Sequence, residues 1–272
     1  MARRRARRSA KGSALSKIIV VAIAAYVLYW LLVAFEEPGA PPAERSEKQS
    51  TPASSYALRA ENSWPSLEKA GQGAAPAADL FAANYYVVLD GSGSMNDVDC
   101  SAGKSKIDAA RTALKSFAAS VPASANLGLA VFERRGIGEL LPLGAGNRQA
   151  FGQAVAQVRA GSGTPLRSAI ALAYDKLEEQ GRRQLGYGEY HLVVVTDGIA
   201  STGEDPTDVV DQMLAESPVL VSTIGFCIRE RHSLNQPGRT DYRAADNPEA
   251  LRKGLEAVLA EAPAFDVSKF KD

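Results

Sequence analysis

The sequence predicts an α/β domain with a mostly parallel central sheet flanked by helices, preceded by one N-terminal transmembrane helix. Short apolar runs alternate with segments of helical periodicity, which is the pattern of such a sheet. Glycine-rich polar loops follow several of these runs, and residues 18–35 contain no charge at all. With 46% hydrophobic and 23% charged residues, the 272-residue chain is too apolar overall for a disordered protein.

The N-terminal region predicts a membrane anchor. Residues 1–17 form a basic tip with seven basic residues and no acidic one, and residues 18–35 approach the ~20 residues that span a bilayer as a helix. The positive-inside rule places the tip in the cytoplasm and the rest of the chain outside it. We expect an uncleaved signal-anchor in the inner (cell) membrane, because a small-x-small cleavage site fits poorly after the apolar run.

The charge balance changes beyond the tip, where 24 basic residues face 31 acidic ones. An acidic folded part argues against a nucleic-acid partner, which requires a clustered basic surface. The expected partners are therefore the lipid bilayer, through residues 18–35, and a protein.

Residues 36–79 predict a linker between the membrane and the folded domain. They are rich in Pro, Ala and Ser and contain few large apolar residues. Trp64 and Leu67 are candidates to dock on the domain. We place the domain at residues 80–265, in the periplasm or outside the cell, and a C-terminal tail at residues 266–272.

The strands of the domain are expected at apolar runs rich in β-branched and aromatic residues, of the length typical of strands buried on both faces. These runs are 85–89, 127–132, 191–195 and 219–226, with weaker signals at 138–143 and 242–244.

The helices are expected where apolar residues recur at helical spacing. The recurring residues are Ile107 to Val121, Phe151 to Val158, Leu166 to Leu177, and Leu251 to Val258. A helix is also expected after Pro206. Thr164-Pro165, Asp205-Pro206 and Asn247-Pro248 each place a capping side chain before a proline suited to a first helical turn.

Polar side chains gather where the expected strands end. Asp90, Ser92 and Ser94 follow the first strand, Asp197 follows the run 191–195, and Thr164 lies in a glycine-rich loop. In open parallel sheets, ligands bind beyond the carboxyl ends of the strands. Two carboxylates and three hydroxyls are hard oxygen donors, which suit Mg²⁺ better than zinc.

These residues resemble the metal-ion-dependent adhesion site of von Willebrand factor type A (vWA) domains. That family's pattern is Asp-x-Ser-x-Ser, a Thr in a later loop and an Asp after a later strand, and residues 84–262 carry all five positions. The resemblance implies a Rossmann-like sheet with a divalent cation at its top. Mg²⁺ is the expected ion, with Mn²⁺ or Ca²⁺ as alternatives, and an acidic residue of a partner would complete its coordination.

The resemblance also bears on the two cysteines. If the strand order follows the family's, Cys100 and Cys227 lie on the same edge of the sheet and can form a disulfide. An even cysteine number outside the cytoplasm favours pairing. The alternative is two unpaired thiols.

The sequence thus predicts a membrane-anchored binding module for metal-dependent protein–protein interaction, and not an enzyme. One alternative is a metal-independent assembly scaffold. The other is a serine hydrolase with Ser92 or Ser94 as nucleophile and His191 or His232 as base. The hydrolase is disfavoured because a Gly-x-Ser-x-Gly turn is missing around both serines and His191 begins its strand, away from the loops.

Overall fold

The computed structural model of the chain describes residues 64–66, 75–228 and 231–260. All of them belong to one compact unit, residues 52–272. The basic tip, the expected membrane helix at residues 18–35 and the C-terminal tail lie outside the described residues. Within the described ranges, every helix is too short or too polar to cross a bilayer.

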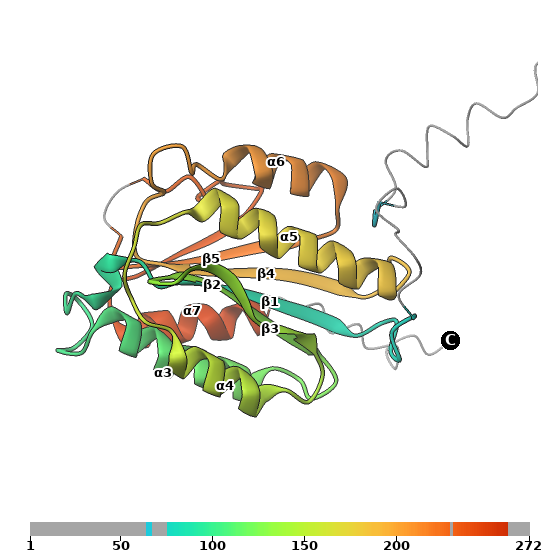
Figure 1. Cartoon of the computed structure of the whole chain (residues 1–272), viewed down its shortest axis with the longest axis horizontal. Helices are drawn as coiled ribbons and strands as arrows, with labels where there is room; N and C mark the ends of the chain where they lie inside the picture. Colours follow the sequence, from blue (N-terminus) through green and yellow to red (C-terminus); the bar gives the residue numbers. More distant parts are fainter. Residues whose placement is uncertain (1–63, 67–74, 229–230, 261–272) are drawn as a thin grey trace, which may run out of the picture. The chain divides into compact units, whose positions relative to one another are not determined.

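A six-stranded sheet forms the centre of the domain (Figure 1), with strand order β3-β2-β1-β4-β5-β6. All neighbouring strands run parallel except β3, which is antiparallel to β2. The mostly parallel sheet predicted from the sequence is therefore confirmed. The strands are β1 (Ala83–Asp90), β2 (Asn126–Glu133), β3 (Gly136–Gly144), β4 (Glu189–Thr196), β5 (Leu220–Phe226) and β6 (Asp241–Ala245).

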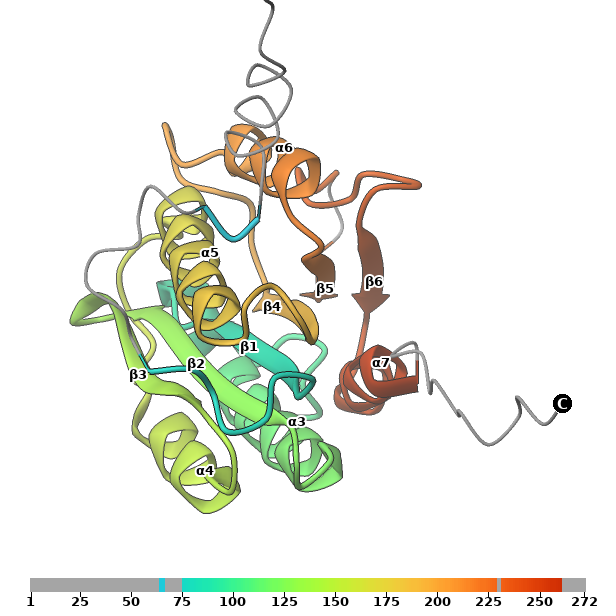
Figure 2. The ribbon, with the colours of Figure 1, turned by 90° about the vertical axis from the view of Figure 1, so that its right-hand side faces the viewer.

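Helices cover both faces of the sheet, as Figures 1 and 2 show. The helices are α3 (Lys106–Ser120), α4 (Arg148–Gln157), α5 (Leu166–Arg183), α6 (Thr207–Glu216) and α7 (Pro248–Ala260). A short 3₁₀ helix, η1 (Gly93–Asn96), follows β1 and was not expected from the sequence.

Alternate residues of β1 point to opposite faces and so divide the core into two layers. Tyr85 and Val87 pack with the apolar sides of α3, α4 and α7. Tyr86 and Val88 pack with α5 and α6 on the other face. Because β1 is buried on both faces, its sequence is a continuous apolar run and does not alternate.

The expected capping side chains are confirmed before two of the three prolines. Asn247 Oδ1 accepts a hydrogen bond from Ala250 N at 2.9 Å, and α7 begins at Pro248. Asp205 Oδ1 accepts from Thr207 N at 2.9 Å, where α6 begins. By contrast, α5 begins at Leu166 without a side-chain hydrogen bond at its cap position. The prediction that Thr164 caps α5 was therefore wrong, which leaves its side chain available for another role.

Trp64 docks on the domain from within the expected linker. Its ring meets that of Tyr190 edge-on, with centroids 4.5 Å apart, and a Cβ on Gly181 would lie only 2.5 Å from it. Ser66 N donates to Glu178 Oε1 at 3.1 Å. These contacts lie where the parallel strands begin, which we call the amino edge. The opposite edge, where β1 and β4 end at Asp90 and Thr196, is the carboxyl edge.

Candidate metal centre

Three loops meet at the carboxyl edge. One follows β1, one precedes α5 and one follows β4. Gly93 N donates to Ser162 O at 2.9 Å, which ties the first loop to the second. Ser201 N donates to Thr164 O at 3.0 Å, which ties the second to the third. Backbone hydrogen bonds therefore hold the three loops together.

Asp90, the last residue of β1, is fully buried with its carboxylate fixed from two sides. Oδ1 accepts from Ser92 N at 2.7 Å, and Oδ2 accepts from Thr196 Oγ1 at 2.6 Å. The next residue has to be glycine, because a Cβ on Gly91 would lie 2.9 Å from Phe132 O. Gly91 N donates to Phe132 O at 2.8 Å, so the backbone lies directly against β2 after Asp90.

The side chains of Ser92, Ser94 and Asp197 form one cluster. The two serine hydroxyl oxygens are 3.0 Å apart. Ser94 Oγ donates to Asp197 Oδ1 at 2.8 Å, and Ser92 Oγ lies 3.5 Å from the same oxygen. Oxygen atoms more than 100 residues apart in sequence thus converge at one point.

Thr164 lies beside this cluster. Its backbone N–H donates to Ser201 Oγ at 2.9 Å, so the loop before α5 is fixed through its main chain. A Cβ placed on Gly198 would lie 3.8 Å from Thr164 Oγ1 and 3.9 Å from Ser94 Oγ. Both hydroxyls therefore face the backbone that follows Asp197. The structure brings all five predicted residues to the same edge.

The site concentrates negative charge in a buried place. Burial, and then the neighbouring carboxylate of Asp197, raise the pKa of Asp90 to about 6, although hydrogen bonds from Thr196 and Ser92 act in the opposite direction. Two carboxylates this close repel each other when both are ionised. A cation near them relieves that repulsion.

The donor set fits a divalent cation such as Mg²⁺. It offers two carboxylates and three hydroxyls, all hard oxygen ligands. Among the described residues, no group of three or more His, Cys, Asp or Glu side chains gathers as a metal cluster. Asp90, Ser92, Ser94, Thr164 and Asp197 are the residues that would hold the ion.

Sequence reasoning missed two residues of the site. Thr196 was not assigned a role from the sequence, yet its hydroxyl fixes Asp90. Lys106, at the start of α3, donates from Nζ to Asp197 Oδ2 at 3.0 Å. For Thr196 the signal was its place at the end of a strand beside Asp197. Lys106 carried no signal beyond being a lysine ahead of an apolar helical pattern.

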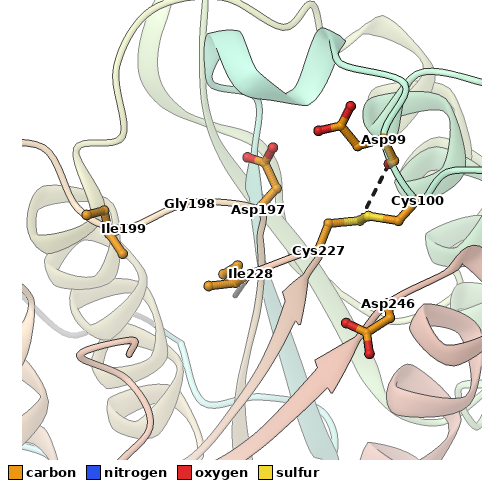
Figure 3. Close-up of a pocket in the computed structure, with 8 residues that line it drawn as sticks. All are labelled: Asp99, Cys100, Asp197, Gly198, Ile199, Cys227, Ile228 and Asp246. Atoms are coloured by element: carbon orange, nitrogen blue, oxygen red, sulfur yellow. Dashed lines mark hydrogen bonds between the residues drawn. A yellow bond between two sulfur atoms is a disulfide. The ribbon is translucent and has the colours of Figure 1, made fainter. Parts of the chain in front are cut away.

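Beside the candidate metal centre, the structure contains the expected disulfide bond between Cys100 and Cys227, with Cα atoms 6.3 Å apart. It borders a cavity of about 780 Å³ (Figure 3). Asp197 lines this cavity too, so the cavity adjoins the metal centre. The other lining residues are Asp99, Gly198, Ile199, Ile228 and Asp246.

The histidines take part in other contacts. His191, in β4 near the amino edge, stacks on Tyr85 with ring centroids 4.7 Å apart. His232 Nε2 lies 3.0 Å from Gly198 O, and its Nδ1 accepts from Leu234 N at 3.1 Å. The hydroxyls of the two serines face each other and Asp197, so this arrangement does not favour a serine nucleophile with a histidine base.

Comparisons with known proteins agree with the observed fold. A Bacillus subtilis protein, "Uncharacterized protein YwmD", is 29% identical over 157 residues, covering 53% of this chain and 67% of that protein. BatB from Bacteroides thetaiotaomicron is structurally similar, with a TM-score of 0.52 and 16% identity over 66% of this chain and 100% of the other.

The pilus adhesin SpaC from Lactobacillus rhamnosus GG has a similar fold, with a TM-score of 0.53 and 15% identity. The match covers 70% of this chain but 31% of SpaC, so the chain spans less than a third of the adhesin. At these identities the likeness concerns the fold alone. The model of the von Willebrand factor type A domain family matches residues 84–271, and the chain therefore belongs to that family.

Proposed function

We propose that this domain binds a protein partner through a divalent cation held at the carboxyl edge. Domains of this family typically mediate protein–protein interaction. The observation that carries the proposal is the convergence of Ser92, Ser94 and Asp197, whose oxygen atoms lie 2.8 to 3.5 Å apart. A bound Mg²⁺ would supply a positive centre with a coordination position for a carboxylate of the partner.

The residues around the ion have separate tasks. Asp90 and Asp197 supply the negative charge that attracts a cation into a buried place. Thr196 and the backbone of Ser92 hold Asp90 in one orientation, at 2.6 and 2.7 Å. The apolar side chains of Ile199 and Ile228 line the adjoining cavity, and they offer a partner surface to cover.

The proposal includes the place of the domain in the cell. Residues 18–35 anchor the chain in the inner membrane with the N-terminus in the cytoplasm, so that the domain lies in the periplasm or outside the cell. The disulfide between Cys100 and Cys227 supports an oxidising compartment. Membrane fractionation followed by protease treatment of spheroplasts tests this: the domain should sediment with membranes and be cleaved without lysis.

Calorimetric titration of Mg²⁺ and Mn²⁺ into the full chain, purified in mild detergent, tests the metal site. One-site binding is expected, and Asp90→Ala should abolish it because the variant removes a buried ligand. Asp99→Ala is the matched control, since Asp99 is exposed and lines the neighbouring cavity. Binding that is absent, or equal in Asp90→Ala, would favour the metal-independent scaffold.

A further inference from the structure

Lys106 forms a buried ion pair inside the candidate metal centre. Its Nζ lies 3.0 Å from Asp197 Oδ2, and the two side chains are 7% and 0% exposed. The other oxygen of the same carboxylate, Oδ1, accepts the hydrogen bond from Ser94. The carboxylate of Asp197 thus contacts two groups: the hydroxyl of Ser94, which is expected to hold the metal ion, and the ammonium group of Lys106.

The position of Lys106 is energetically unfavourable for two reasons. It is the first residue of α3, where the partial positive charge of the helix N-terminus disfavours a cation. Burial of an ammonium group adds a desolvation cost that only a close partner offsets. Lys104, two residues earlier, is exposed to solvent and avoids the desolvation cost. The pairing with Asp197 is therefore what makes the placement of Lys106 tolerable.

The backbone holds Lys106 where it is. Its N–H donates to Asp97 O at 2.9 Å, directly after η1, so the start of α3 is tied to the loop that carries Ser92 and Ser94. The ammonium group cannot leave Asp197 through a simple shift of the helix without disturbing that loop.

The charges of the site explain what such a pairing does. Asp90 and Asp197, when both ionised, carry two negative charges, and the ammonium group paired with Asp197 reduces this to a single net negative charge. A divalent cation would turn this into a single positive charge, whereas without Lys106 the same cation would give a neutral site. The ammonium group therefore works against loading by the ion alone.

We propose that Lys106 is an intrinsic competitor of the metal: it stabilises the metal-free site and weakens binding of the divalent cation. This inference rests on the proposed metal-binding function and specifies its regulation. The positive charge left after loading favours an anionic group, so a partner carboxylate and the metal bind more tightly together than either does alone.

Calorimetric titration of Mn²⁺ into the full chain in mild detergent tests the inference. Lys106→Gln removes the charge but can still donate a hydrogen bond to Asp197. It should lower the Kd for Mn²⁺ by about tenfold or more, because a like charge at short range has been removed. Lys106→Arg keeps the charge and should stay within about threefold of the wild type, as should the exposed control Lys104→Gln.

Thermal unfolding of the metal-free proteins gives a second readout in the opposite direction. Lys106→Gln should lower the midpoint by roughly 5–10 °C, since it leaves buried carboxylates without their counter-ion. A residue with a purely structural role would weaken both metal binding and stability when replaced. Lys106→Met, which keeps the aliphatic stem, takes the place of glutamine if that variant does not fold.

Two failures are distinguishable. If the wild type binds Mn²⁺ and both Lys106→Gln and Lys106→Met bind it equally or more weakly, Lys106 orients Asp197 and the competitor role is overturned. If neither the wild type nor any Lys106 variant binds Mn²⁺, the proposed metal-dependent function fails and takes this inference with it. Tighter binding by the neutral variants alone supports the competitor role.

Discussion

The two edges of the sheet bury polar side chains in different ways. At the amino edge, Asn84 Nδ2 donates to Gln184 Oε1 at 2.7 Å and to two backbone carbonyls, while its Oδ1 accepts from Asn126 at 2.9 Å. Gln184 Nε2 in turn donates to Ala82 O at 2.9 Å. These groups are neutral and satisfy one another.

At the carboxyl edge, the buried groups carry charge. Asp197 lies close enough to Asp90 to raise its pKa. Asp197 in turn contacts the hydroxyl of Ser94 and the ammonium group of Lys106. A network of neutral amides that hydrogen-bond to one another stabilises the fold but provides no free group for a ligand. A buried cluster with excess negative charge destabilises the metal-free protein, but the same charge allows it to bind a cation. The following variants test whether these two roles are separate.

Asn84→Ala should have the largest effect on stability. It leaves several buried polar groups at the amino edge without partners, at a cost of about 4 kcal/mol. Chemical unfolding of the full chain measures this cost, and calorimetry should find the Mn²⁺ affinity unchanged. Asn235→Ala, at an exposed position, is the control and should be near neutral. A parallel loss of metal affinity in Asn84→Ala would contradict the separation of the two edges.

Asp90→Asn should act on stability in a pH-dependent way. The folded-state pKa of Asp90 is raised from 3.8 to about 6. Its contribution to the stability of the folded protein is therefore fully present below pH 4, where the carboxyl is protonated, and is lost as the pH rises through 6. The neutral variant avoids that loss. In the presence of a chelator at pH 7 it should be more stable than the wild type by up to about 3 kcal/mol, and at pH 4 the two should converge.

Unfolding curves at the two pH values check this prediction. Asp99→Asn serves as control, because that side chain is exposed and should show no such pH dependence. Equal stabilities of Asp90→Asn and the wild type at both pH values would mean that the carboxyl edge does not store repulsion in the metal-free protein.

Trp64→Ala should have the smallest effect of the three. It removes the edge-on contact with Tyr190 and leaves a gap over Gly181, at a cost of about 2 kcal/mol because the ring is only partly buried. Thermal unfolding measures this cost. Phe81→Ala is the control, because the Phe81 side chain is 73% exposed. The affinity of the variant for Mn²⁺ should equal that of the wild type. A change in this affinity would show that the amino edge and the carboxyl edge are energetically coupled.

Much of the fold could be predicted because its signals are local. The apolar runs gave every strand of the sheet, including the weak signals at 138–143 and 242–244, which became β3 and β6. Asp90, Ser92 and Ser94 are neighbours in sequence. Asp197 joined them through one general rule, that loops after parallel strands share an edge. Thr164, which lies in the loop between α4 and α5, was added through the resemblance to the vWA family.

The remainder depends on contacts that a local pattern does not contain. The helix start at Thr164-Pro165 was misjudged because Ser201, from another loop, holds the backbone of Thr164 and α5 begins later. Lys106 could not be assigned to the site, because its role depends on where the start of α3 lies relative to the loop after β4. Trp64 was recognised as a candidate to dock, but the surface it covers is formed by Gly181 and Tyr190, more than 100 residues away in sequence.

The central position of β1 has a mechanical consequence. This strand begins at Ala83, on the side where the N-terminal part of the chain enters the domain, and ends at Asp90 in the candidate metal centre. A force between the N-terminus and a partner held at Asp90 would therefore be directed along β1. Its backbone hydrogen bonds to β2 and β4 lie across that direction on both sides, so they would share the load and would not open one after another.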